Sequence, residues 1–189
     1  NLLPQIEKKC VRLLRAKEKT SFAYYLLSHT YMRMLVAEPL NLSFLKQSFN
    51  LAQEAIDLDP KQEYGFLALS HFYESMGEEA YSIDILNKLE KNLSPSWRVN
   101  FAKARITANQ APKEALSLFH KSFSDLSSNR SILAPYVIKT IDAAYSLVER
   151  FSIIDQWNRE FPLDEFKAAM ALNLSATGQF DKANQIYSQ

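Results

Sequence analysis

Three histidines are the residues of this chain with the most obvious capacity for chemistry. His29, His71 and His120 lie in separate predicted helices. His29 and His71 occupy equivalent places in successive helical segments, so their rings could approach each other. Two histidines without a third ligand make a poor metal site, even with Glu74 close to His71 in the sequence. We therefore expect two polar side chains facing a groove, with no metal and no other cofactor.

Cys10 is the one cysteine, which excludes a disulfide framework and a cysteine-rich zinc site. Lys9 and Arg12 could lower the thiol pKa and make Cys10 reactive. Cys10 also lies on an apolar helical stripe with Ile6 and Leu13, where an inert buried cysteine is the usual occupant. We expect the buried thiol.

Catalytic signatures are missing from the sequence. There is no His-Glu-x-x-His motif, no Gly-x-Ser-x-Gly motif and no Walker loop. The three glycines, Gly65, Gly77 and Gly178, are too far apart to form a phosphate-binding loop. We therefore expect a protein that is not an enzyme.

The first twenty residues are strongly basic. They carry six basic and two acidic side chains, and Lys8, Arg12, Arg15 and Lys19 share one helical face. This face could contact an acidic partner or a phosphate backbone, but a solvated outer face of a terminal helix is the expected role. The whole chain has a net charge of only +1, so we expect no direct binding of nucleic acid.

Composition favours a globular all-α protein. The 189 residues are 47% hydrophobic and 23% charged, and the scarcity of glycine argues against a barrel or sandwich of short strands. No apolar run approaches the ~20 residues that span a bilayer, and the first residues do not resemble a signal peptide. The chain begins without Met, so we interpret it as part of a longer or processed protein; its location is open, with the cytoplasm favoured over the periplasm.

A pattern of two helices joined by a turn repeats along the chain with a period of about 34 residues. Two helices flank Gly77, and the same pattern recurs around Gly178. A small residue opens each second helix and recurs with this period. The series is Ser48, Ser82, Ala115 and Ala183. The missing member of this series falls near Glu149.

These patterns resemble the tetratricopeptide repeat family over nearly the whole chain. The residues that carry the resemblance are Leu69-Ser70 with Tyr73, then Gly77 and Ala80/Ser82, together with Ala55-Ile56, Leu58-Asp59-Pro60 and Gly178 to Ala183. The resemblance implies an all-α right-handed superhelix of antiparallel helix pairs, a TPR-like α-solenoid. We predict a single domain over 1–189, with a leading helix at 2–18 and repeats at about 21–60, 63–95, 96–129, 130–162 and 164–189.

The fourth predicted repeat departs furthest from the family pattern. It has no glycine turn, and its second helix is predicted as a short segment from about Ser152 to Glu160. We expect it to be the least stable repeat. In the third repeat, Lys103 falls where a small residue is expected.

The resemblance implies that the first helix of each pair lines a concave groove and contacts the ligand. The expected groove residues are Phe22, Tyr25, His29, Tyr64, Leu67, His71, Trp97 and Asn100. The Lys and Asn set with which some members bind C-terminal carboxylates is not present. An apolar and aromatic groove suits an amphipathic helix or an extended apolar peptide. Ordinary helix–helix packing is the alternative role for the rings.

We therefore expect a scaffold that recognises another protein or peptide through this groove, with self-association also open. The first third of the chain also resembles the TPR segments of bacterial ToxR-type winged-helix transcription activators. The residues behind this second resemblance are Tyr24 to Ser28 and Ala55 to Pro60, separated by a longer link. It implies an alternative function, a regulatory or effector-sensing domain of a larger activator.

Overall fold

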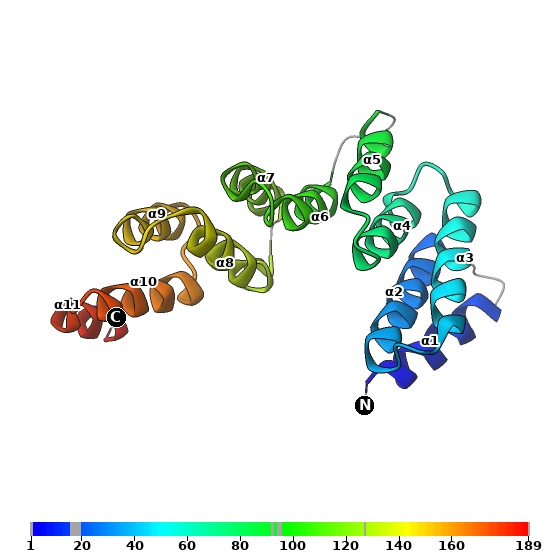
Figure 1. The fold of residues 1–189 in the computed structure, drawn as a ribbon, viewed down its shortest axis with the longest axis horizontal. Coiled ribbons are helices and arrows are strands. Elements are labelled where there is room, and N and C mark those ends of the chain that lie inside the picture. The colour runs from blue at the N-terminus through cyan, green and yellow to red at the C-terminus, as the bar shows by residue number, and fades with distance from the viewer. Residues whose placement is uncertain (1, 16–19, 92, 94–95, 127, 189) are drawn as a thin grey trace. The chain divides into compact units, whose positions relative to one another are not determined.

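The computed structural model describes residues 2–15, 20–91, 93, 96–126 and 128–188. Within these residues the chain forms eleven α-helices and one short 3₁₀ helix, and no strand (Figure 1). The helices contact mainly their neighbours in sequence. The all-α prediction is confirmed, and the sequential packing is consistent with a helical repeat. No helix in the described part of the chain is long and apolar enough to cross a membrane.

The chain forms two compact units, residues 1–95 and residues 96–189. In the N-terminal unit, α2 packs against α1, α3 and α4, and α4 packs against α3 and α5. The bounds of these helices are α1 Leu3–Arg15, α2 Ser21–Ala37, α3 Leu42–Leu58, α4 Glu63–Ser75 and α5 Glu79–Glu90. Residues 16–18 of the predicted leading helix lie outside the described residues.

The C-terminal unit contains two close helix pairs, α6 with α7 and α10 with α11. Between them, α8 packs on α7, and α9 packs more extensively on α10 than on α8. The bounds are α6 Trp97–Thr107, α7 Pro112–Asp125, η1 Arg130–Ile132, α8 Ala134–Ala144, α9 Leu147–Glu160, α10 Asp164–Ala176 and α11 Phe180–Tyr187. Its core is rich in buried aromatic rings, among them Phe119, Phe123 and Phe166.

Glycine closes two of the helix–helix turns, as the sequence predicts. Gly77 follows α4 with φ 79° and Gly178 follows α10 with φ 78°, a backbone conformation that a side chain disfavours. In each turn the next amide reaches back to a carbonyl of the preceding helix: Glu78 to Tyr73 at 2.8 Å, and Gln179 to Leu174 at 2.9 Å. These bonds satisfy carbonyls that the helix end leaves open.

The predicted small residues do lie at the buried contacts. Ser48, Ser82, Ala115 and Ala183 are all buried. Each serine meets a serine of the first helix of its pair: the oxygens of Ser28 and Ser48 lie 2.9 Å apart, and those of Ser70 and Ser82 lie 2.7 Å apart. In the third pair, Ala104 beside Lys103 is fully buried. Small side chains therefore let the paired helices approach closely.

Gly65 marks a close approach between α3 and α4 that the sequence pattern does not predict. A Cβ on Gly65 would lie 2.6 Å from the backbone nitrogen of Ile56 and 2.9 Å from the carbonyl carbon of Ala55. The first turn of α4 therefore packs directly on the backbone of α3.

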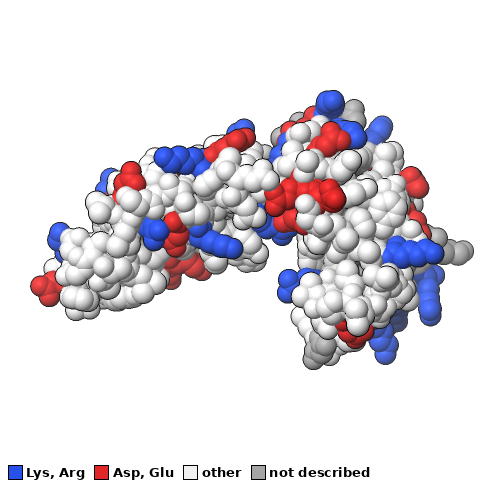
Figure 2. Space-filling view, in the orientation of Figure 1, with Lys and Arg blue, Asp and Glu red and all other residues white. Residues whose placement is uncertain are grey.

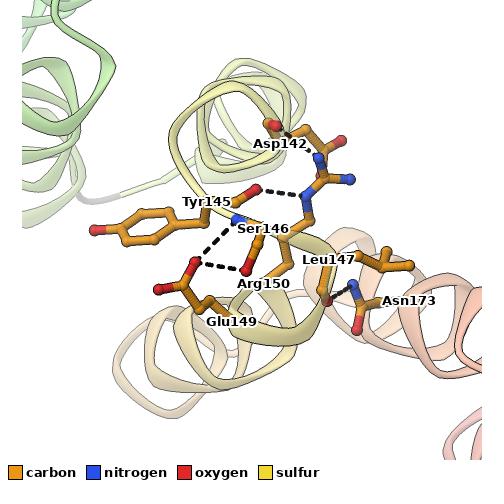
Figure 3. A network of polar contacts seen from close by, with 7 residues as sticks. All are labelled: Asp142, Tyr145, Ser146, Leu147, Glu149, Arg150 and Asn173. Carbon is orange, nitrogen blue, oxygen red and sulfur yellow. Dashed lines mark hydrogen bonds and ion pairs between the residues drawn. The ribbon is translucent and has the colours of Figure 1, made fainter.

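The prediction of a short second helix from Ser152 was wrong. The helix α9 begins at Leu147, five residues earlier. A capping box replaces the missing glycine turn: the Glu149 carboxylate accepts from the Ser146 amide at 2.9 Å and from the Ser146 hydroxyl at 2.6 Å (Figure 3). These hydrogen bonds from Ser146 lower the pKa of Glu149.

Arg150 reinforces this helix start. Its guanidinium donates to the carbonyls of Tyr145 at 3.1 Å and Asp142 at 2.7 Å, and so binds the end of α8 (Figure 3). Asn173 of α10 donates to the Leu147 carbonyl at 3.0 Å. One polar network thus ties α9 to both neighbouring helices.

Candidate functional site

Aromatic side chains from α2 and α4 meet in the N-terminal unit. The Phe22 and Tyr64 rings pack edge to face, with centroids 5.0 Å apart, and Tyr25 lies 5.9 Å from Tyr64. Phe22 also contacts Tyr25 at 6.2 Å. We call these three rings, with His29 and His71, the aromatic surface.

His29 and His71 extend this surface by two helical turns. Their rings stack with centroids 4.3 Å apart. His29 follows Phe22 by seven residues and His71 follows Tyr64 by seven, so the two helices present the same pattern side by side. The stacking agrees with the expectation from the sequence that the His29 and His71 rings could approach each other.

The aromatic surface is only partly covered by the protein itself. Phe22 is 44% exposed, and the other four rings are half-buried. By contrast, Tyr24 and Leu27 on another side of α2 are buried. The rings therefore pack helix on helix and still offer apolar area to a ligand.

Ionisable groups border this surface. Arg33 follows His29 by four residues on α2, and Glu74 follows His71 by three on α4. Residues at these spacings share a helix face. The sequence therefore places one basic and one acidic residue close to the two histidines along α2 and α4.

The described contacts of the aromatic surface do not include the other three expected groove residues. Leu67 is 6% exposed and belongs to the interior of the N-terminal unit. Asn100, in the C-terminal unit, is 4% exposed. Trp97 of the same unit packs against its core, with the Arg98 guanidinium 4.7 Å from the ring centroid. The described contacts unite five of the eight expected residues.

His120 lines a separate pocket of about 230 Å³ in the C-terminal unit. Its Nε2 lies 2.7 Å from a carboxylate oxygen of Glu160, and its ring contacts Trp157. Ser117 also lines the pocket, but its hydroxyl donates to the Glu114 carbonyl at 2.8 Å. This serine hydroxyl is therefore directed at its own helix and not at the histidine.

Cys10 is a buried thiol, as expected. It packs with Leu27 and Tyr31 of α2. Burial raises the pKa of Cys10, which keeps the thiol protonated and disfavours reaction. Among the described residues, no three His, Cys, Asp or Glu side chains lie together in a way that could hold a metal ion.

Two features of the structure are not among the expectations from the sequence. The pocket around His120 and Glu160 combines residues of α7 and α9, and no sequence spacing connects them. The capping box of Ser146 and Glu149 did have a signal, because Ser-x-x-Glu before an apolar run is typical of a helix start.

The sequence matches no protein-family model and no curated protein. The chain is therefore described by its fold, an all-helical protein of eleven helices packed in sequential pairs within the described residues.

Proposed function

We propose that this chain is a protein–protein interaction module that binds a peptide or helical segment of a partner through its aromatic surface. The observation that supports this proposal most strongly is the cluster of Phe22, Tyr25 and Tyr64, which are in mutual contact while Phe22 remains 44% exposed. Rings held by one another lose little conformational freedom when a ligand covers them.

The chemistry of the surface favours an apolar ligand. Aromatic side chains offer large contact areas and often contribute most of an interface's free energy. The tyrosine hydroxyls and the two histidines add polar atoms that can fix the register of a bound chain. An amphipathic helix, or an extended peptide with spaced apolar side chains, suits this combination.

We further propose that the helix pairs form a TPR-type right-handed superhelix. The period of about 34 residues, the glycine turns at Gly77 and Gly178, and the buried small residues of each second helix support it. In such a superhelix the first helices of successive pairs line the concave side. That arrangement would place α2 and α4 where a peptide ligand binds.

The proposal is tested by selecting peptides from a random displayed library on the intact chain. Selected peptides are then titrated against Phe22→Ala/Tyr64→Ala, with circular dichroism and melting checked for each variant. We expect this double change to weaken binding by about 2–4 kcal/mol, because two contact rings are truncated. Helicity should stay near that of the wild type.

The matched control is Lys46→Ala/Lys61→Ala, which also truncates two long exposed side chains, outside the aromatic surface. We expect it to leave the affinity of the selected peptides nearly unchanged at physiological salt. Equal losses in both double variants would contradict the proposal. If the aromatic double variant unfolds, the single change Tyr25→Ser takes its place and should weaken peptide binding. The chemical shifts of His29 and His71 should also change on peptide addition. If neither effect is seen, the proposal is contradicted.

A further inference from the structure

The helix α1 presents a row of cations to solvent. Lys8, Lys9, Arg12 and Arg15 are all exposed, and their spacing places them along one side of the helix. Figure 2 shows Lys and Arg side chains gathered at the edge of the molecule where Figure 1 places α1. We call these four residues the basic face.

No carboxylate of α1 neutralises this face. The one acidic residue of the helix, Glu7, accepts a hydrogen bond from the Tyr31 hydroxyl of α2 at 3.1 Å. Burial and this contact raise the pKa of Tyr31 to about 12. Among the described residues, no ion pair is formed by the four cations of the basic face. Within the described part of the chain, the positive charge of the basic face is therefore not paired.

Two exposed leucines flank the basic face. Leu2 is 68% exposed and Leu13 is 48% exposed. They are eleven residues apart, which is three helical turns or about 16 Å. The opposite side of α1, centred on Cys10, is covered by α2. The outer side thus combines cations with apolar side chains at a helical spacing.

We propose that the outer side of α1 is a docking surface for an acidic amphipathic helix of a partner protein. Carboxylates on such a helix would pair with Arg12 and Arg15, whose planar guanidinium groups match them. Its apolar residues would cover Leu2 and Leu13. The helix would lie beside α1 as α1 lies beside α2, which continues the packing of the N-terminal unit.

An anionic membrane is the less favoured partner. A helix that embeds in a bilayer surface needs a free apolar side, and in α1 that side is already packed on α2. The two exposed leucines offer little insertion. A protein helix needs no insertion and uses the cations and the leucines together.

The test titrates the full chain with a fluorescent helical peptide built from three copies of a heptad that holds two leucines and four glutamates. Anisotropy is measured at about 50 mM and about 500 mM salt. We expect saturable binding that Arg12→Gln/Arg15→Gln weakens about five- to tenfold at low salt. Lys46→Gln/Lys61→Gln, which removes the same charge outside α1, should weaken it less than twofold.

The variant Leu13→Ser distinguishes specific docking of the helix from nonspecific electrostatic binding of any polyanion. It should weaken the peptide about threefold or more, and the loss should persist at high salt because the contact is apolar. An unaffected Leu13 variant, or equal losses in the two glutamine double variants, would overturn the proposal. Binding to vesicles of phosphatidylcholine with phosphatidylserine, without binding of the peptide, would assign the face to membranes instead.

This inference does not depend on the proposed peptide-binding function of the aromatic surface. Tyr64→Ser should leave the acidic peptide's affinity unchanged, since Tyr64 lies on α4 and α1 packs on α2. A loss in that variant would contradict docking on α1.

Discussion

The side-chain oxygens of Ser70 and Ser82 lie 2.7 Å apart in the interior between α4 and α5, and the Ser82 hydroxyl also donates to the Ser70 carbonyl at 2.7 Å. Because the Ser82 proton is given to the carbonyl, the Ser70 hydroxyl donates to Ser82. Ser28 and Ser48 form the mirror arrangement, in which the serine of the first helix donates to a carbonyl of the second. Each pair joins two helices through hydroxyls that satisfy one another.

Removing one hydroxyl of this pair should cost more than removing both. Ser82→Ala leaves the Ser70 hydroxyl buried without this acceptor, which should cost about 1–3 kcal/mol of unfolding free energy. Ser70→Ala/Ser82→Ala leaves neither hydroxyl without its partner, so it should cost less than the sum of the two single changes. Two buried alanines, Ala104 and Ala115, already take these places in the third pair. Urea unfolding of the three variants measures this coupling. Strict additivity would contradict a mutually satisfied pair.

Gly65→Ala should destabilise the N-terminal unit. The new methyl group would lie 2.6 Å from both the backbone nitrogen and Cγ1 of Ile56, so α4 must move away from α3. We expect a loss of about 1–3 kcal/mol or more, measured by thermal unfolding.

Gly77→Ala is the matched control for Gly65→Ala. Nothing lies within 4 Å of its Cβ position, so only the backbone strain at φ 79° remains, about 1–2 kcal/mol. Amide hydrogen exchange separates the two effects. Loss of protection in α3 should follow Gly65→Ala only, and unchanged protection there would contradict the close approach.

Glu149 should make the start of α9 sensitive to acid. Hydrogen bonds from Ser146 lower its pKa in the folded protein, so its contribution is present above the unfolded pKa and is lost as pH falls through the folded value. Between pH 7 and about 3, Glu149→Gln should remove part of the decline in stability. Parallel stability curves for the two proteins would show that this carboxylate has no such role.

The second helix of the fourth predicted repeat should be stable, contrary to expectation from the sequence. Ile154 and Trp157 of α9 are buried in the core of the C-terminal unit. Trp157→Ala should therefore cost about 3–5 kcal/mol, whereas Tyr187→Ala at an exposed position should cost little. Chemical denaturation decides between them, and a small effect at Trp157 would restore the expectation of a weak repeat.

The sequence predicted features that depend on one helix or one turn. Gly77 and Gly178 identified their turns because only glycine adopts that conformation readily. The equivalent places of His29 and His71 in successive helical segments predicted that their rings could meet. Burial of the predicted groove residue Leu67 was not predictable, because it depends on how closely α4 packs on its neighbours.

The start of α9 and the close approach at Gly65 show two other limits. In α9, a serine and a glutamate begin the helix without a glycine or proline before it, so the pattern of turn residues predicts a start only at Ser152. Gly65 matters because of the backbone of Ile56, which a pattern of side chains does not reveal. The start of α9 and the contact at Gly65 both depend on backbone geometry, which the periodic pattern of apolar side chains does not report.

The central claim, that the aromatic surface contacts a partner, is tested most directly by photocrosslinking in the native cell. The photoreactive residue p-benzoylphenylalanine replaces Phe22 in one sample and the exposed Leu172 of the C-terminal unit in another. We predict a discrete protein adduct from position 22 that position 172 does not give, and that Tyr64→Ser removes. The same adducts from both positions, or an adduct at position 22 that survives Tyr64→Ser, would contradict the claim.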